Sequence, residues 1–253
     1  PNYHRTLTRH TYTRYIPSGR CYDLHLPILY AVTGRTGGTQ MQDAREHFTE
    51  RLDKVKQDIL KMGTLVEESI RKSMRALVEK DIPLAEQVIQ EDEAVNEMEL
   101  SIQDDCVAII ATEQPVASDL RSIVTDIKVA TQLERMGDHA RHVARTTLEL
   151  SDQKYMKKLI DLPRMADIVA TAYIKQDADE ASEIAERDDQ IDDLHDQVLR
   201  EVMTYMMQDP ANIAQAISLL FVARFLERLG DHVTNIAEWI CYNVEGKHLE
   251  LNK

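Results

Sequence analysis

The feature that most constrains the fold is an internal duplication. The octet LERMGDHA at 133–140 returns as LERLGDHV at 226–233, with six of eight positions identical and an offset of 93 residues. The segment 76–99 also aligns without gaps on 172–195, and Pro115 corresponds to Pro210. Two copies are too few for a solenoid, so the chain is expected to hold two tandem units of the same fold.

Both units are predicted to be helical. From residue 41 onward only four glycines and four prolines remain, helix-forming residues dominate, and the alternation typical of strands is absent. An apolar stripe at three- and four-residue steps predicts a long first helix that packs in a bundle at shallow crossing angles. The stripe consists of Phe48, Leu52, Val55, Ile59, Met62, Val66, Ile70, Met74 and Leu77.

Each unit therefore reads as a three-helix bundle, which predicts an all-α protein with bundles at 41–152 and 153–253. The five later helices are expected from Pro83 to about Thr112, from Pro115 to about Leu150, over 154–176, over 178–208, and from the break at Asp209-Pro210 to about Tyr242. Residues 1–40 hold three prolines and four glycines without a sustained period, so a leader or disordered extension outside the fold is expected.

Charge and cysteine usage narrow the function. Residues 1–40 carry five arginines against Asp23, whereas the whole chain has a net charge of −14, so the helical body is strongly acidic. Such a body argues against nucleic acid as a partner and suits cations or basic protein surfaces. Three isolated cysteines fit a reducing cytoplasm. The sequence has no apolar run of the ~18 residues that membrane insertion requires.

The duplicated octets place acids four residues apart, Glu134 with Asp138 and Glu227 with Asp231. On a helix the two carboxylates share a face, and like charges there cost roughly 0.2–0.5 kcal/mol. The chain holds 44 acidic residues, so the spacing alone is a weak signal. Both pairs continue the apolar line of their helix, however, which predicts core-facing carboxylates, and an unpaired charge in the core is very costly.

The preceding helix of each unit offers matching polar residues, Asp92 with Asn96 and Asp188 with Asp192. Carboxylates that converge from facing helices bind cations or pair with basic groups, and oxygen ligands suit Mg, Ca, Mn or a ferric cluster. Three residues form a second tier of metal ligands: Asn96, His195 and Glu238.

Structural alternatives remain open for these residues. The octet acids are alternatively paired with one of the nearby arginines, Arg135, Arg141, Arg145 or Arg228. The acids of the preceding helices are alternatively helix N-terminal acids or part of a solvated face. His139 and His232 read as surface or interface histidines. Cys106 and Cys241 read as small core residues.

Signatures of catalysis are missing from the sequence. It contains no Gly-rich phosphate loop, no nucleophile elbow and no HExxH motif. A di-iron site would need Glu-x-x-His from two helices, and the nearest match is Asp192 to His195. The chain is therefore predicted not to be an enzyme. The alternatives are a metal-dependent hydrolase whose carboxylates activate water and a purely structural helical scaffold.

Two tandem three-helix units, each with an ERxGD helix (ERMGD at 134–138 and ERLGD at 227–231), resemble the PhoU family of bacterial phosphate-signalling regulators. QPVASDLR at 114–121 and VMTYMMQDP at 202–210 support the resemblance, which covers about 45–245. It implies a cytoplasmic, non-enzymatic negative regulator of phosphate uptake and the phosphate-starvation response, commonly a homodimer. Its implied partners are the ATPase subunit of the phosphate ABC transporter and a membrane sensor histidine kinase.

The resemblance also implies metal clusters on acidic motifs, with iron, zinc, manganese or magnesium as the ion. By position, the first site would use Asp92, Glu134 and Asp138. The second site would use Asp188, Asp192, Glu227 and Asp231. Asn96 stands where Asp192 stands in the second unit. A neutral amide binds a cation less tightly, so the second site is expected to be the stronger one.

Overall fold

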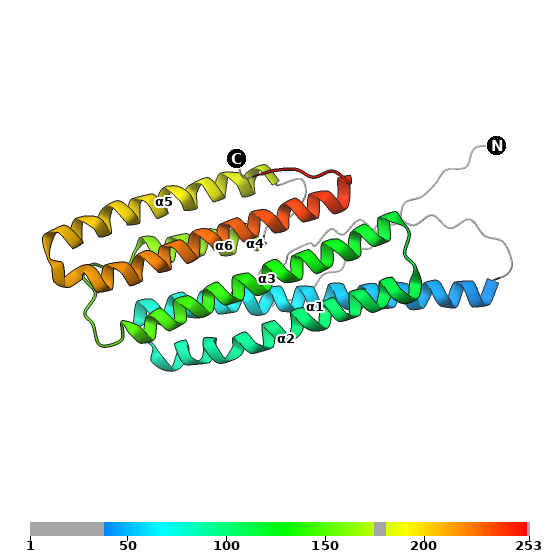
Figure 1. Cartoon of the computed structure of the whole chain (residues 1–253), viewed down its shortest axis with the longest axis horizontal. Coiled ribbons are helices and arrows are strands. Elements are labelled where there is room, and N and C mark those ends of the chain that lie inside the picture. The colour runs from blue at the N-terminus through cyan, green and yellow to red at the C-terminus, as the bar shows by residue number, and fades with distance from the viewer. Residues whose placement is uncertain (1–37, 175–180, 252–253) are drawn as a thin grey trace, which may run out of the picture. The chain divides into compact units, whose positions relative to one another are not determined.

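The chain folds into the two tandem three-helix bundles that the duplication predicts (Figure 1). The computed structural model describes residues 38–174 and 181–251. The helices are α1 (Gly38–Glu79), α2 (Ile82–Glu113), α3 (Ala117–Glu149), α4 (Asp161–Ile174), α5 (Ala181–Gln208), a 3-10 turn (Pro210–Asn212) and α6 (Ile213–Glu245). Residues 44–253 form one compact unit that contains both bundles. The all-α prediction is confirmed.

Residues 1–37, which make up most of the predicted leader, lie outside the described residues, and α1 begins at Gly38. Residues 175–180, where the fourth helix was expected to end and the fifth to begin, also lie outside them.

Local capping explains where the better-predicted helices begin and end. The Asp81 side chain accepts a hydrogen bond from the Leu84 N–H at 3.0 Å, and Pro83 occupies the first turn of α2. At the other end of the chain, Gly246 adopts a φ of 71° and its N–H donates to the Tyr242 carbonyl oxygen at 2.9 Å, which closes α6. The predicted break at Asp209-Pro210 is the 3-10 turn, which Asp209 caps by accepting from the Ala211 N–H.

The start of the fourth helix was predicted at 154 and is wrong, because α4 begins at Asp161. Long-range hydrogen bonds hold the preceding segment out of the helix. The Tyr155 hydroxyl donates to the Leu77 carbonyl oxygen at 2.5 Å, and the Met156 N–H donates to the Gln215 side-chain oxygen at 2.7 Å. Pro163 in the first turn is the local signal that marks the true start.

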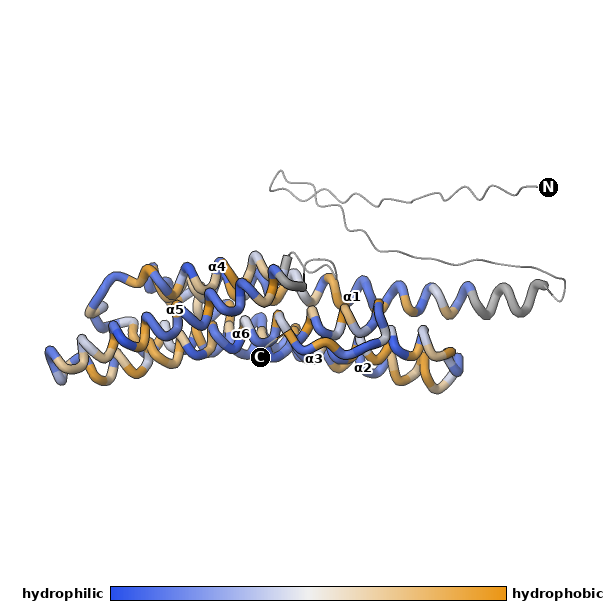
Figure 2. Tube along the Cα trace, turned by 90° about the horizontal axis from the view of Figure 1, so that it is seen from above, coloured by the Kyte–Doolittle hydropathy of each residue, from blue (hydrophilic) through white to orange (hydrophobic). Residues whose placement is uncertain are grey.

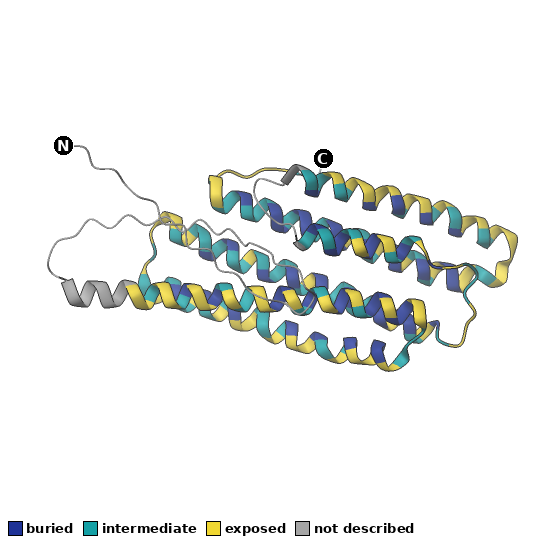
Figure 3. Ribbon diagram, turned by 180° about the vertical axis from the view of Figure 1, so that it is seen from behind, coloured by how far each residue is buried: buried dark blue, intermediate teal, exposed yellow. Residues whose placement is uncertain are grey.

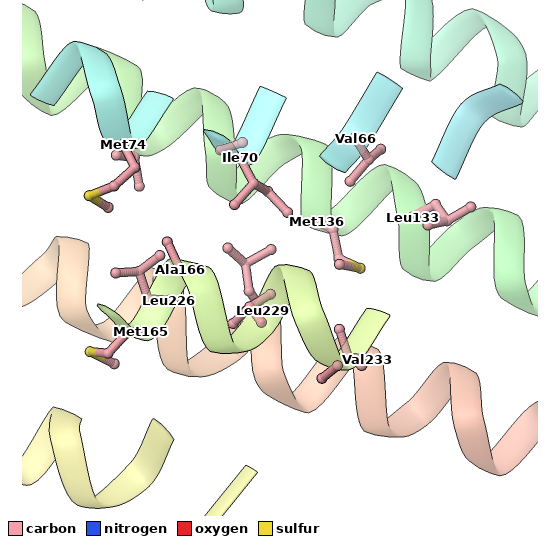
Figure 4. Close-up of a cluster of buried hydrophobic side chains, with 14 of the residues drawn as sticks. Val66, Ile70, Met74, Leu133, Met136, Met165, Ala166, Leu226, Leu229 and Val233 are labelled. Atoms are coloured by element: carbon pink, nitrogen blue, oxygen red, sulfur yellow. The ribbon is translucent and has the colours of Figure 1, made fainter. Parts of the chain in front are cut away.

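One hydrophobic core runs through both bundles. Its centre is formed by α1 and α3 on one side and by α4 and α6 on the other, and α3 packs along α6 (Figure 4). The helices show the apolar stripes and buried faces that this arrangement requires (Figures 2 and 3). The side chains that meet there include Val66, Ile70, Met74, Leu133, Met136, Met165, Ala166, Leu226, Leu229 and Val233.

Helices α2 and α5 each pack against the ERxGD helix of their own bundle, α2 on α3 and α5 on α6. This pairing brings the predicted acids of α2 and α5 to the octets of α3 and α6. Within the described ranges, no helix combines the length and the apolar character that crossing a lipid bilayer requires.

Candidate metal centres

The octet glycines let each pair of helices approach closely beside an acidic residue. A Cβ atom at Gly137 would lie 3.5 Å from Asp92 Oδ1. A Cβ atom at Gly230 would lie 2.7 Å from Asp188 Oδ1 and 3.0 Å from Ile191 Cδ1. The glycine, which costs a helix interior about 1 kcal/mol, therefore makes room for the carboxylate of the neighbouring helix in both bundles.

In the first bundle an arginine lies between the predicted ligands. Arg141 Nε forms an ion pair with Asp92 Oδ2 at 3.0 Å, and Arg141 Nη2 pairs with Asp138 Oδ1. Asp92 is buried, and burial raises its pKa while Arg141 opposes the rise. Burial also raises the pKa of Glu134, with Asp138 as the next cause. The ion-pairing alternative, raised for the octet acids, is therefore realised for Asp138, and the same arginine also pairs with Asp92.

The second bundle lacks a counterpart of this arginine. The equivalent position, 93 residues on, is Thr234, whose buried hydroxyl donates to the Gly230 carbonyl oxygen at 3.1 Å. Asp188 lies among acids, and burial followed by the charges of Asp192 and Asp231 raises its pKa to about 7. Arg224 opposes the rise in the pKa of Asp192, Glu227 and Asp231, whereas every cause of the shift at Asp188 raises its pKa.

Glu227 adds an acceptor that is left unused. Its Oε1 accepts from Arg224 Nη1 at 2.6 Å, whereas its Oε2 is buried without a hydrogen-bond partner among the described residues. Burial, then the charge of Asp231, raises the pKa of Glu227. His195 lies near enough to lower the pKa of this carboxyl and that of Asp192, against the rise that burial causes in each.

The second-tier residues differ in what they contact. Asn96 Oδ1 is buried and makes no hydrogen bond within the part of the chain that the structure describes. His195 lies beside the acids of the second bundle, as above. Glu238 instead accepts a hydrogen bond from the Leu251 N–H at 2.7 Å, which ties down the C-terminal segment.

The prediction that the octet acids face the core needs a correction. Glu134, Asp138, Glu227 and Asp231 are half-buried at the edge of each helix pair, and Asp192 is exposed. The prediction placed Glu134 and Asp138 on the line of apolar residues that starts at Leu120 on the same helix, and Leu120 is itself exposed. Each ERxGD helix contacts both its own bundle and the other one, so its buried face is wider than one stripe and the acids lie at its margin.

The donor chemistry fits a hard cation better in the second bundle than in the first. Carboxylate oxygens are the ligands of such ions, and the orphaned oxygen of Glu227 and the mutual repulsion around Asp188 would both be relieved by positive charge. In the first bundle, Arg141 already supplies that charge. Across residues 38–174 and 181–251, no three His, Cys, Asp or Glu side chains are arranged to hold a metal ion as they stand. The metal sites therefore stay a prediction.

The histidines and cysteines of the octet helices occupy defined places. His139 and His232 stack on each other between α3 and α6, with ring centroids 5.3 Å apart and an interplanar angle of 18°. Cys106 and Cys241 are free and buried, as predicted. The sequence shows that His139 and His232 occupy equivalent positions in the two octets. It could not predict that their rings stack, because this contact depends on how the bundles pack together.

The fold and its repeated acidic motif define a class of helical protein, built from two equivalent three-helix bundles with a carboxylate cluster in each. The PhoU domain matches the chain twice, at residues 59–147 and 162–240, once in each bundle. The chain belongs to the PhoU family.

Relatives and solved structures agree with this assignment. The phosphate-specific transport system accessory protein PhoU homolog of Pseudomonas putida is 37% identical over 219 residues, covering 82% of this chain and 86% of the relative. The PhoU accessory protein of Escherichia coli (strain K12) is 37% identical over 207 residues, with 79% and 86% covered.

The crystal structure of PhoU from Pseudomonas aeruginosa has a TM-score of 0.72 at 37% identity and covers 79% of this chain and 100% of that one. The phosphate transport system regulatory protein PhoU from Streptococcus pneumoniae has a TM-score of 0.73 at 29% identity, with 80% and 99% covered.

Matched glycine substitutions test the close approach of the helices. Gly137→Ala leaves an ordinary contact with Asp92 at 3.5 Å and a tight one with Val95 Cγ1 at 3.3 Å. Its free energy of unfolding should change by less than about 1 kcal/mol, because the gain in helix propensity offsets the tighter packing against Val95. Gly230→Ala forces the Asp188 carboxylate to move and should destabilise the protein by about 1–3 kcal/mol. Urea unfolding of both variants makes the comparison. Equal effects would contradict the asymmetry.

The raised pKa of Asp188 predicts a pH dependence in the metal-free protein. The folded state binds this proton more tightly than the unfolded state, whose pKa is near 3.8, so the stability it adds is present below about pH 4 and is lost as the pH rises through about 7. Asp188→Asn should remove that loss, so thermal unfolding in a chelator should show the variant gaining on the wild type between pH 5 and 8.

The matched control is Asp193→Asn, on the exposed face of α5. This variant should follow the wild type across the pH range. An Asp188→Asn variant whose melting temperature runs parallel to that of the wild type would contradict the assigned environment.

Proposed function

We propose that this protein is a negative regulator of phosphate uptake and phosphate-starvation signalling, which acts as an adaptor and not as an enzyme. The observation that carries the proposal is the PhoU-domain match in both bundles, together with relatives named as accessory and regulatory proteins of phosphate transport. An adaptor needs surfaces and a stable frame, and the shared core of the two bundles supplies the frame.

Metal binding in this proposal centres on the second bundle. Asp188, Asp192, Glu227 and Asp231 would hold the ion. Its positive charge would offset the burial and the carboxylate repulsion that together raise the pKa of Asp188. The first bundle would bind more weakly because Arg141 pairs with two of its carboxylates. The ion is proposed to be iron, zinc, manganese or magnesium, and its role is to hold α5 against α6.

The partners in this proposal are the ATPase subunit of the phosphate ABC transporter and a sensor histidine kinase. The proposed location is the cytoplasm, where the protein would reach both of these partners. The proposed assembly is a homodimer. The support from the chain is its charge: a net of −14 suits basic protein surfaces. Nucleic acid is not a proposed partner.

Elemental analysis of the purified chain tests the metal part. Glu227→Ala with Asp231→Ala should remove most of the bound metal, because two of the four second-bundle ligands are lost. The matched double variant, Glu134→Ala with Asp138→Ala, should keep most of it. Circular dichroism shows that each variant folds. Metal content unaffected by the second-bundle change, or removed equally by both, would overturn the proposed site.

Affinity capture with each partner tests the adaptor part. The wild-type chain should retain the transporter ATPase and the cytoplasmic portion of the kinase, and added salt should weaken both complexes because the acidic surface contributes to them. Failure to bind either partner, in the presence and in the absence of metal, would leave the adaptor function without support and refute this part of the proposal.

A further inference from the structure

A cleft of about 390 Å³ lies between α3 and α6, where the two bundles meet. Its lining repeats the duplication, because the residues of α3 recur on α6 at an offset of 93. The equivalent pairs are Arg135 and Arg228, Asp138 and Asp231, His139 and His232, and His142 and Asn235. The cleft is therefore built symmetrically from both ERxGD helices.

Aromatic rings form a rigid wall of this cleft. His139 stacks on His232 on one side and on Phe225 on the other, with centroids 5.3 and 5.6 Å apart. His142 lies 4.9 Å from the ring of Phe225. His232 Nδ1 is 2.7 Å from Gln132 Oε1, which crosses from α6 to α3. The rings are thus fixed before any ligand arrives.

One ring nitrogen on this wall has no use within the protein. His139 Nδ1 is buried and lacks a hydrogen-bond partner among the described residues. Buried polar atoms are nearly always hydrogen-bonded, and an exception calls for a missing partner. The nitrogen lies beneath the surface of the cleft, so it is not itself a contact for a ligand held there.

The positive charge of the cleft comes from its arginines. Arg135 and Arg228 line the cleft together with the rings of His139 and His232. Two aspartates, Asp138 and Asp231, also line the cleft. Asp138 is paired with Arg141. Burial, followed by the charge of Asp192, raises the pKa of Asp231.

We propose that this cleft binds an oxyanion of the phosphate type between Arg135 and Arg228. A guanidinium group presents a planar set of donors that matches phosphate oxygens. One guanidinium group can donate to both oxygens of a planar carboxylate. Two guanidinium groups on facing helices can donate to different oxygens of a tetrahedral anion. The Asn235 amide also lines the cleft and supplies further hydrogen-bond capacity without adding charge.

The charges argue against a metal ion in the same place. Two guanidinium groups repel a cation. An anion held by both arginines would instead connect α3 to α6 and stabilise one arrangement of the two bundles. Such binding would let the protein respond to a phosphate compound directly. That physiological role rests on the proposed function, but the binding itself does not.

Isothermal titration calorimetry of the full chain in a chelating buffer tests the proposal. Inorganic phosphate is titrated in one arm and AMP, a phosphomonoester, in the other. Arg135→Gln and Arg228→Gln should each weaken binding at least about tenfold, which corresponds to ~1.4 kcal/mol, and the double variant should abolish it. Arg145→Gln, an exposed arginine on α3 outside the cleft, should keep the wild-type affinity.

Binding of AMP alone would support the site and assign it to a phosphorylated small molecule. Binding of inorganic phosphate would support the site as a receptor for the free ion. The proposal is overturned if neither ligand binds at millimolar concentration, if binding requires added metal, or if the two arginine variants bind as the wild type does. Partner capture is measured separately, so failure of the cleft and failure of the adaptor function are distinguishable.

Discussion

Carboxylates at a crossing of two helices are the constraint on which the rest of the site depends. Removing a carboxylate from water is costly unless it is paired, and both bundles bring one against a glycine of the facing helix. The first bundle answers with Arg141, which pairs with Asp92 and Asp138. The second has Thr234 at the equivalent position, and there burial, followed by the charges of the neighbouring acids, raises the pKa of Asp188. The exchange of Arg141 for Thr234, together with that of Asn96 for Asp192, thus distinguishes the first site from the candidate metal centre.

The ERxGD helices connect this constraint to the whole fold. On each of them, apolar residues face the shared core, the Glu and the Asp lie toward the middle helix of the bundle, and the Arg and the His reach the cleft between the bundles. Asp138 and Asp231 belong both to an acidic cluster and to the lining of that cleft. A change of charge in the acidic cluster of either bundle therefore directly affects a residue that lines the cleft between α3 and α6. The two bundles contact each other at that cleft.

Much of this arrangement could be predicted from the sequence, and what could not depends on tertiary contacts. The duplication and the apolar stripes predict six helices in two bundles, and the register of the copies pairs Asp92 with the first octet and Asp188 with the second. The irregular segment before α4 was missed because Tyr155 and Met156 bond to residues far along the chain. Arg141 was one of four candidate arginines, and only the packing of α2 on α3 selects it. The cleft was not predictable, because Arg135 and Arg228 line the same space only once the two bundles pack against each other.

Anomalous X-ray diffraction from crystals of the protein loaded with manganese, iron or zinc would test the central claim most directly, since it locates the ion without substituting any residue. The account predicts strong anomalous density among Asp188, Glu227 and Asp231, and weak or absent density beside Asp92 and Asp138, where Arg141 supplies the charge. Equal density at both places, or density in the first bundle alone, would contradict it.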